Sequence, residues 1–262
     1  MCIRDYDLYV MNKKYLNILR ELTVSEFKLR DQSSLLGFFW TLLHPLLLFT
    51  VLYFLFTKWM GAFIEHYPLY LIIGIVQWTF FASSTTYALS SLVRRADLVK
   101  NLKFPYEIIV ISSIFTALIS HVFELIVLLV FIAAMGIMPG WLYLLLPLIV
   151  LIELMLIIAV SLPLAKLCVY YRDIEHIWSI FTTAGFFLTP IFYSLSIISP
   201  ERRQLLLLNP VTHIINATRD CLIYHRMPDT WALFAIFCGS AVLAGAGYLL
   251  FKHGEKEYPE IL

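Results

Sequence analysis

Long apolar stretches free of Asp, Glu, Lys and Arg alternate with short polar segments along this chain. Each stretch is long enough for a helix that crosses a bilayer, which takes about 20 residues. The stretch Leu125 to Ile152 contains Gly136 and the Pro139–Gly140 pair, which divide it between two helices. The pattern predicts an all-α membrane protein with six transmembrane helices, near residues 37–57, 67–92, 107–135, 141–164, 176–194 and 230–251.

The N-terminal segment has a different pattern. Between Leu8 and Leu22 the apolar residues recur at helical spacing, and most polar residues fall opposite them. This is typical of an amphipathic helix that lies in a membrane interface or docks on a partner, or packs on the chain's own loops. We therefore divide a single transmembrane domain, residues 1–262, into a cytoplasmic interface segment (1–36), a six-span bundle (37–251) and a cytoplasmic tail (252–262).

The stretch from Phe186 to Tyr224 begins as a membrane span and is then broken by Pro190, Pro200 and Pro210. Each proline removes a backbone donor and disfavours helix in the residue before it. The apolar runs between them are too short to cross a bilayer. We expect short re-entrant helices between spans 5 and 6, either as a gate over a conduit or as an apolar cap on the bundle.

Composition strengthens the membrane prediction, because 61% of the residues are hydrophobic and only 14% are charged. Fourteen of the 19 Lys and Arg residues fall on the side of the two termini, which places both termini in the cytoplasm by the positive-inside rule. The net charge of +1 gives no reason to expect nucleic acid. The four cysteines have no CxxC spacing and suggest neither a metal site nor a disulfide framework.

The loop after span 2 is short, basic and amphipathic. Leu98 and Leu102 are four residues apart on one predicted helical face, and Pro105 ends the element before span 3. Such a helix suits a groove on a soluble partner, although a plain positive-inside anchor is the competing interpretation. The candidate coupling residues are Arg94, Arg95, Asp97, Leu98, Lys100 and Leu102.

Span 2 carries a stripe of polar and aromatic residues. Hydroxyl, amide and aromatic side chains can bind a sugar chain, but Ser and Thr also join membrane helices to one another. With aromatics of span 5, the candidate substrate path consists of Tyr70, Gln77, Phe81, Ser84, Phe186 and Tyr193.

Three ionisable residues fall inside predicted spans, namely His121, Glu124 and Glu153. Ionisable groups are costly at membrane depth, so they are candidates for a proton relay or for structural contacts. The chain has no GxxxxGK[ST] phosphate-binding loop and neither an HExxH nor a GxSxG motif. It cannot by itself hold ATP in the manner of such a loop.

Four ordered motifs resemble those of one family, the polysaccharide-export ABC transporter permeases of the Wzm type. They are the run from Ser33 to Leu46, the sequence Tyr171-Arg172-Asp173-Ile174, the run Leu188 to Tyr193, and the run Leu208 to His213. The family commonly has Asn where this chain has His44.

The resemblance implies a half-transporter that pairs with a second copy of itself and with two separate ATP-binding cassette subunits, which would hold ATP and Mg. The complex would export an undecaprenyl-linked polysaccharide, such as O antigen, across the inner membrane. The loop from Arg94 to Phe104 would be the coupling helix. Lys28 and Arg30 would attract the lipid pyrophosphate, and an external gate would include Pro200, Asn209, Pro210 and His213.

Two other classes stay open at this stage. A membrane enzyme acting on polyprenyl-linked sugars would use Glu124, Glu153 and His213 as acid and base groups. A proton-coupled flippase would require Glu124 or His121.

Overall fold

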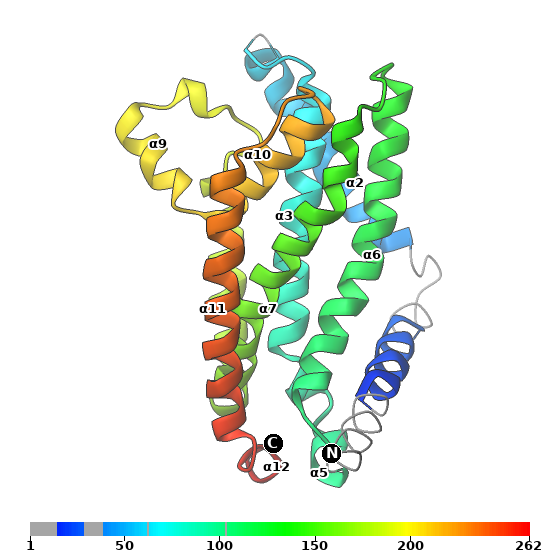
Figure 1. The fold of residues 1–262 in the computed structure, drawn as a ribbon, viewed down its shortest axis with the longest axis vertical. Coiled ribbons are helices and arrows are strands. Elements are labelled where there is room, and N and C mark those ends of the chain that lie inside the picture. Colours follow the sequence, from blue (N-terminus) through cyan, green and yellow to red (C-terminus); the bar gives the residue numbers. More distant parts are fainter. Residues whose placement is uncertain (1–14, 29–38, 62, 103) are drawn as a thin grey trace, which may run out of the picture.

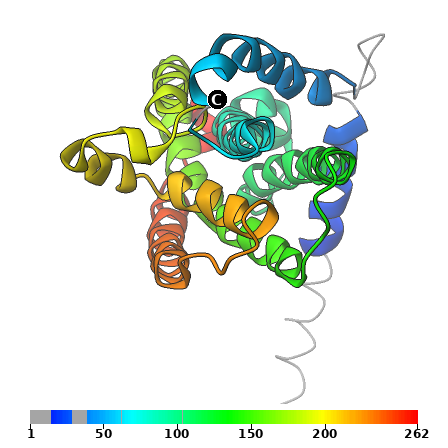
Figure 2. The same cartoon turned by 90° about the horizontal axis from the view of Figure 1, so that it is seen from above.

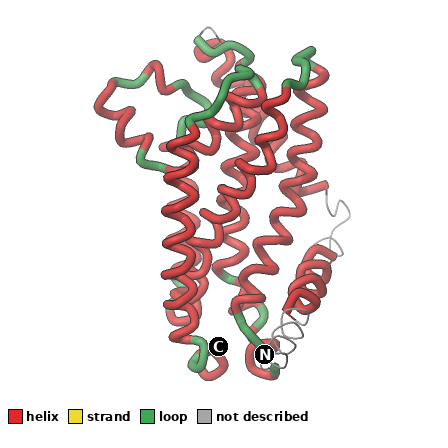
Figure 3. The backbone as a smooth tube through the Cα atoms, in the orientation of Figure 1, coloured by secondary structure: helices red, strands yellow, loops and turns green. Residues whose placement is uncertain are grey.

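The computed structural model describes residues 15–28, 39–61, 63–102 and 104–262, and within these ranges the chain is helix and loop without a strand (Figures 1 and 3). A helix over residues 15–28 comes first. The elements after it are α2 (Phe39–Met60), α3 (Tyr67–Leu89), α4 (Ser91–Arg94), α5 (Ala96–Asn101), α6 (Glu107–Ala134), η1 (Trp141–Leu145), α7 (Leu146–Tyr170), α8 (Ile174–Leu188), η2 (Leu195–Ile197), α9 (Pro200–Leu207), α10 (Pro210–Leu222), α11 (Thr230–Gly254) and α12 (Tyr258–Ile261).

Five of the described helices are long and apolar enough to cross a membrane, and each overlaps a predicted span. They are α2, α3, α6, the continuous helical run Trp141–Tyr170 formed by η1 and α7, and α11. The chain is therefore an integral membrane protein with an all-helical fold.

The predicted span at 176–194 falls on α8, which is not one of the five. With 15 residues, α8 is about 22 Å long at 1.5 Å per residue, short of the hydrocarbon core of a bilayer. It ends at Leu188 because Thr189 precedes a proline and adopts an extended conformation, with ψ of 139°. Six complete spans are thus not confirmed.

Helix α3 forms the centre of the bundle, where Figure 2 shows it surrounded by the other helices. It packs against α2, α6, α7, α8 and α10. Of the residues in its most apolar window, 78% are buried, compared with 11% for α2 and 17% for α11. The outer helices therefore present apolar faces that suit lipid or a protein neighbour.

The polar segments gather at the two ends of the bundle (Figure 1). Helices α9 and α10 lie at one end, beside the start of α11. The short helices α5 and α12 lie at the other end, and they contact each other.

Candidate functional site

The predicted coupling loop folds into two short helices, α4 and α5, at the α12 end of the bundle. Val99 is buried, and its carbonyl accepts a hydrogen bond of 3.1 Å from the Tyr106 hydroxyl. Leu98 is half-buried and Leu102 is 52% exposed. The face of α5 that carries Leu102 is thus open, while the neighbouring face anchors the helix to the bundle.

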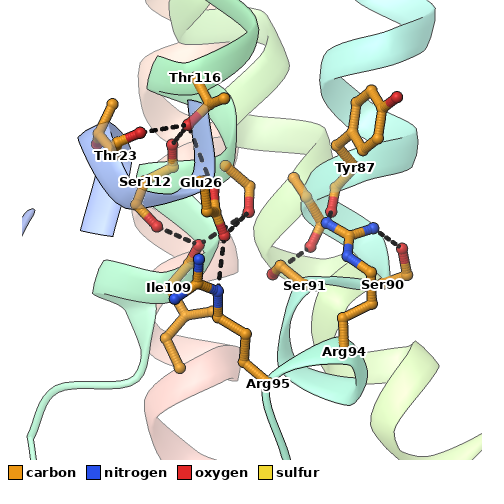
Figure 4. Close-up of polar contacts among 12 residues, drawn as sticks. Thr23, Glu26, Tyr87, Ser90, Ser91, Arg94, Arg95, Ile109, Ser112 and Thr116 are labelled. Atoms are coloured by element: carbon orange, nitrogen blue, oxygen red, sulfur yellow. Dashed lines mark hydrogen bonds and ion pairs between the residues drawn. The ribbon is translucent and has the colours of Figure 1, made fainter. Parts of the chain in front are cut away.

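The charged residues of this loop divide into bound and open groups. Asp97 and Lys100 are exposed. Arg94 donates from Nη1 to the Ser90 hydroxyl, at 2.5 Å, and from Nη2 to the Tyr87 carbonyl, at 2.8 Å (Figure 4). These bonds hold the Arg94 guanidinium beside the end of α3.

Arg95 joins α4–α5 to the helix of residues 15–28. Its Nε lies 2.9 Å from a carboxylate oxygen of Glu26, and both side chains are largely buried, at 17% and 14% exposed. The Glu26 carboxylate also accepts bonds from Ser113 and Thr116 of α6 (Figure 4). One carboxylate therefore connects three elements, namely the 15–28 helix, the α4–α5 segment and α6.

A cavity of about 450 Å³ opens beside this junction. Its walls come from the 15–28 helix, from α3, from the α4–α5 segment and from α6, and include Glu26, Tyr87, Arg94, Leu98 and Thr116. The α4–α5 segment thus borders free space on the side of Arg94 and Leu98.

The C-terminal end of the chain fixes the other side of α5. Lys252 of α11 lies 3.0 Å from Glu107 and 2.8 Å from Glu255, and the amide of Tyr106 donates to Glu255 at 3.1 Å. Tyr258 of α12 is fully buried and donates to the Phe251 carbonyl at 2.7 Å. Burial raises the pKa of the Tyr258 phenol, so it stays a neutral donor.

At the opposite end, Arg219 of α10 is only 1% exposed. Its N–H groups donate to the carbonyls of Tyr70 (3.0 and 3.2 Å), Pro190 (2.9 Å) and Ile191 (2.9 Å), and to the Asn216 side chain (3.3 Å). These bonds occupy all five donors of a guanidinium. The guanidinium carbon also lies 3.4 Å from the centroid of the Tyr70 ring. Arg219 therefore joins α3, α10 and the break after α8.

Sequence reasoning missed this role and counted Arg219 only as an external basic residue. A signal was present, because Ile215 and Leu222 lie four residues before and three after it on the same helical face, and both are buried. Gly74 makes the close approach possible, since a Cβ there would lie 2.7 Å from Arg219 Nη2.

The predicted gate residues build the corner between α9 and α10. Asn209 caps α10 by accepting from the Val211 amide at 3.0 Å, and its side-chain amide donates to Thr189 at 2.9 Å. Pro200 and Pro210 occupy first turns of α9 and α10, where a missing N–H costs nothing. His213 Nε2 lies 2.8 Å from the Leu207 carbonyl.

The predicted substrate-path residues lie mostly in the packed core. Tyr70, Gln77, Phe81 and Ser84 are buried among the neighbours of α3, and Gln77 donates to Thr218 of α10 at 3.0 Å. Phe186 is 9% exposed and Tyr193 is half-buried. A cavity of about 550 Å³ between α3, α2 and α8 is instead lined by the hydroxyl-bearing residues Thr79, Ser83, Thr86 and Tyr87 of α3. Of the predicted path residues, Phe186 lines it too.

The ionisable residues of the predicted spans are buried near the bundle centre. His121 stacks on Phe80 with ring centroids 4.0 Å apart, and its Nδ1 lies 3.6 Å from Glu124. Glu153 is fully buried on α7. His213 lines a cavity at the α9–α10 end, and Glu124 faces a shallow groove among α2, α3 and α6, so the cavities they face are separate.

Two residues, Lys28 and Arg30, were predicted to attract a lipid pyrophosphate at the entrance of span 1. Lys28 is the last residue of the 15–28 helix, and its side chain is exposed. Arg30 lies outside the described residues, as does the run 33–38 that begins the first family motif. The roles of Lys28 and Arg30 stay predictions.

Comparison with known proteins decides the family. The family model described as ABC-2 type transporter matches residues 18–223. This chain belongs to the ABC-2 type transporter family. An O-antigen export system permease protein RfbA from Myxococcus xanthus is 34% identical over 249 residues, covering 94% of this chain and 96% of that protein. Two proteins of the same name from Klebsiella pneumoniae are 29% and 27% identical over 94% of this chain.

Membership of the ABC-2 type transporter family makes this chain a transport subunit. The match includes the 15–28 helix from residue 18, the coupling segment α4–α5 and the whole of α9 and α10. The family region therefore includes the Glu26–Arg95 junction at one end of the bundle and Arg219 at the other, whereas α11 and α12 lie beyond it.

Proposed function

We propose that this chain is the permease subunit of an ATP-driven exporter that moves an undecaprenyl-linked polysaccharide, O antigen in the first instance, across the bacterial inner membrane. The similarity to three O-antigen export permeases over 94% of the chain carries this proposal. We found no observation that favours the membrane enzyme or the proton-coupled flippase.

In this proposal both termini are cytoplasmic and the chain forms a single transmembrane domain. The sixth crossing is made by α8 together with the irregular residues 189–194. Helices α9 and α10, with the corner at Asn209, Pro210 and His213, form the external gate. The exposed apolar face of α2 and the cavity between α2 and α8 suit a second copy of the chain and the glycan path between the copies.

The coupling mechanism follows from the geometry at the α5 end. Leu102, Asp97 and Lys100 are exposed and would contact an ATP-binding cassette subunit, which holds ATP and Mg. Movement of that subunit would displace α5 into the adjoining cavity. The Glu26–Arg95 pair would pass the displacement to the 15–28 helix and to α6. Lys28 and Arg30 would attract the lipid pyrophosphate at the start of span 1.

Co-purification tests the proposal most directly. The chain is expressed with its neighbouring genes, isolated in mild detergent and examined for an ATP-hydrolysing subunit in equal amount. We expect that subunit to be present, and the double variant Leu98→Asp, Leu102→Asp to lose it or to hydrolyse ATP without export. Leu102→Asp alone is the milder variant, because its side chain is already exposed.

The matched control carries the same change at the other end of the bundle, Leu205→Asp with Leu208→Asp, both of which are exposed. The control is expected to retain the ATP-hydrolysing subunit. Purification of the wild-type chain alone, with activity on a polyprenyl-linked sugar, would contradict the exporter proposal and support the enzyme.

A further inference from the structure

A second polar cavity, of about 530 Å³, lies at the α9–α10 end of the bundle. It is enclosed by η2, α9, α10, the loop after α10 and the start of α11, and Tyr70 and Arg219 form part of its wall. Its volume lies within the range of about 300–1,000 Å³ that small-ligand sites occupy. The gate role proposed above concerns the helices around this space but assigns no ligand to it.

Charges of both signs alternate around the cavity. The cations are Arg203, Arg219 and Arg226, and the carboxylates are Asp220 and Asp229. Asp220 Oδ1 accepts from both Nε and Nη2 of Arg226 at 2.7 Å, and Asp229 Oδ1 accepts from the amide of Ala232 at 3.1 Å. These contacts hold the carboxylates in place and leave the second oxygen of each available.

Other groups on the wall also have unused hydrogen-bonding capacity. Within the described part of the chain, the Arg203 guanidinium and the Tyr224 hydroxyl have no hydrogen-bond or ion-pair partner, and the Asn216 amide nitrogen donates to none. The cavity thus offers free donors and free acceptors side by side.

This mixture discriminates between ligand classes. A fully ionised phosphate or pyrophosphate only accepts hydrogen bonds, so it could pair with Arg203 but would leave the free oxygens of Asp220 and Asp229 without a donor. A metal ion needs a cluster of ligands, and the described residues contain no group of three or more His, Cys, Asp or Glu that could hold one. A sugar hydroxyl both donates and accepts, and therefore suits such a wall.

The wall is also held rigidly. Arg219 is fixed by its five hydrogen bonds, Asp220 by Arg226, and His213 by the Leu207 carbonyl. Among the groups fixed in this way, the Asp220 carboxylate keeps a free oxygen, and it loses little conformational entropy when it accepts a hydrogen bond from an uncharged, strongly hydrated ligand.

From these observations we infer that the cavity between α9, α10 and the start of α11 binds a sugar residue of the exported glycan through its hydroxyl groups. The inference rests on the proposed function for the identity of the ligand. Each transporter would then hold the glycan at its exit, where a bound sugar keeps the emerging chain from sliding back.

The test measures binding of a defined probe to the purified transporter, with its ATP-hydrolysing subunit present. The probe is the polysaccharide of the same strain, released from its lipid by mild acid, and the measurement is isothermal titration calorimetry. We expect the wild type to bind, and Arg203→Ala to bind about tenfold more weakly, since one hydrogen bond to a charged group is lost. Tyr224→Phe should weaken binding by a smaller factor.

Arg202→Ala is the matched control, because Arg202 is the exposed neighbour of Arg203 on α9 and does not line the cavity. It should bind as the wild type does. Three outcomes would overturn the inference: no polysaccharide binding by a complex that still exports, displacement of the polysaccharide by pyrophosphate in an Arg203-dependent manner, or dissociation of the dimer in Arg203→Ala. Failure of the proposed function is separate, because it shows as absence of the ATP-hydrolysing subunit or of export.

Discussion

Arg95 and Arg219 lie at opposite ends of the bundle and are held in opposite ways. Arg95 is 17% exposed and pairs with one carboxylate, that of Glu26, beside a cavity. Arg219 is 1% exposed and donates to three backbone carbonyls and one amide side chain. The Glu26–Arg95 pair borders a cavity, so water can replace either partner when the two side chains separate. A cation bound to backbone carbonyls in the core has no such replacement.

In the proposed mechanism the two arginines have different parts. The Glu26–Arg95 pair lies where motion of the ATP-binding partner would enter the bundle, and a single side-chain pair suits repeated rearrangement. Arg219 closes the break between α8 and the irregular segment before η2, where a proline has removed the helical hydrogen bonds. The variants below test whether Arg219 contributes more to stability than the Glu26–Arg95 pair does.

The largest effect is expected from Arg219→Leu. The change leaves the carbonyls of Pro190 and Ile191 buried without donors, at about 1–3 kcal/mol for each unsatisfied group. We expect little folded protein and a sharply lower Tm in detergent, measured by size-exclusion yield and thermal unfolding. The Tm of Arg219→Lys should lie between those of the wild type and Arg219→Leu, because an ammonium keeps the charge but lacks the planar guanidinium that reaches all the partners.

Arg202→Leu provides the control for these variants, since Arg202 is exposed on α9. If the Arg219→Leu variant kept the wild-type Tm, the carbonyls of Pro190 and Ile191 would have found other donors. Arg219 would then not be the stronger anchor of the two arginines.

A smaller effect is expected from Gly74→Ala. The added methyl group would lie 2.7 Å from Arg219 Nη2 and 3.1 Å from the Ile191 side chain, so the guanidinium must shift. Overpacking of this kind costs about 1–3 kcal/mol. Thermal unfolding should show the loss, while Gly239→Ala should be neutral because nothing lies within 4 Å of its added methyl.

The smallest effect on stability is expected from Glu26→Gln, about 1 kcal/mol, because the amide oxygen can still accept hydrogen bonds from Arg95, Ser113 and Thr116 and only the charge is lost. Its effect should appear in transport instead, as ATP hydrolysis without proportionate export. Charge reversal sharpens the test. Glu26→Arg and Arg95→Glu should each impair export, and the double variant should recover part of it. Glu21→Gln, exposed on the same helix, is the control.

If Glu26→Gln lowered the Tm as much as Arg219→Leu, the two sites would both be structural anchors. Equal export by Glu26→Gln and wild type would remove the pair from the coupling route.

The apolar pattern predicted five of the long helices closely. The predictions 37–57, 67–92, 107–135, 141–164 and 230–251 correspond to Phe39–Met60, Tyr67–Leu89 with α4, Glu107–Ala134, the run Trp141–Tyr170 of η1 and α7, and Thr230–Gly254. The agreement reflects a local cause, since a run of about 20 apolar residues must satisfy its backbone bonds within itself when it meets lipid. The prediction at 176–194 was less accurate, because Pro190 interrupts an apolar run whose composition alone resembles a span.

The candidate sites were predicted unevenly. Arg94, Asp97 and Lys100 proved exposed at one end of the bundle, where the sequence suggested a loop open to a partner. The face of α5 that packs on the bundle carries Val99, however, which the spacing of Leu98 and Leu102 did not single out. Periodicity identifies which residues share a face, but not what that face meets.

The sequence alone determined the membrane class, the family motifs and the breaks at Pro190, Pro200 and Pro210, because these depend on residue type and nearest neighbours. Only the tertiary structure decided that the polar stripe of α3 is buried, that Glu26 reaches Arg95, and that Arg219 binds the carbonyl of Tyr70, 149 residues away in the chain. The role of a buried polar group depends on the groups to which it is hydrogen-bonded. Those partners come from distant segments, which are brought together only when the helices pack.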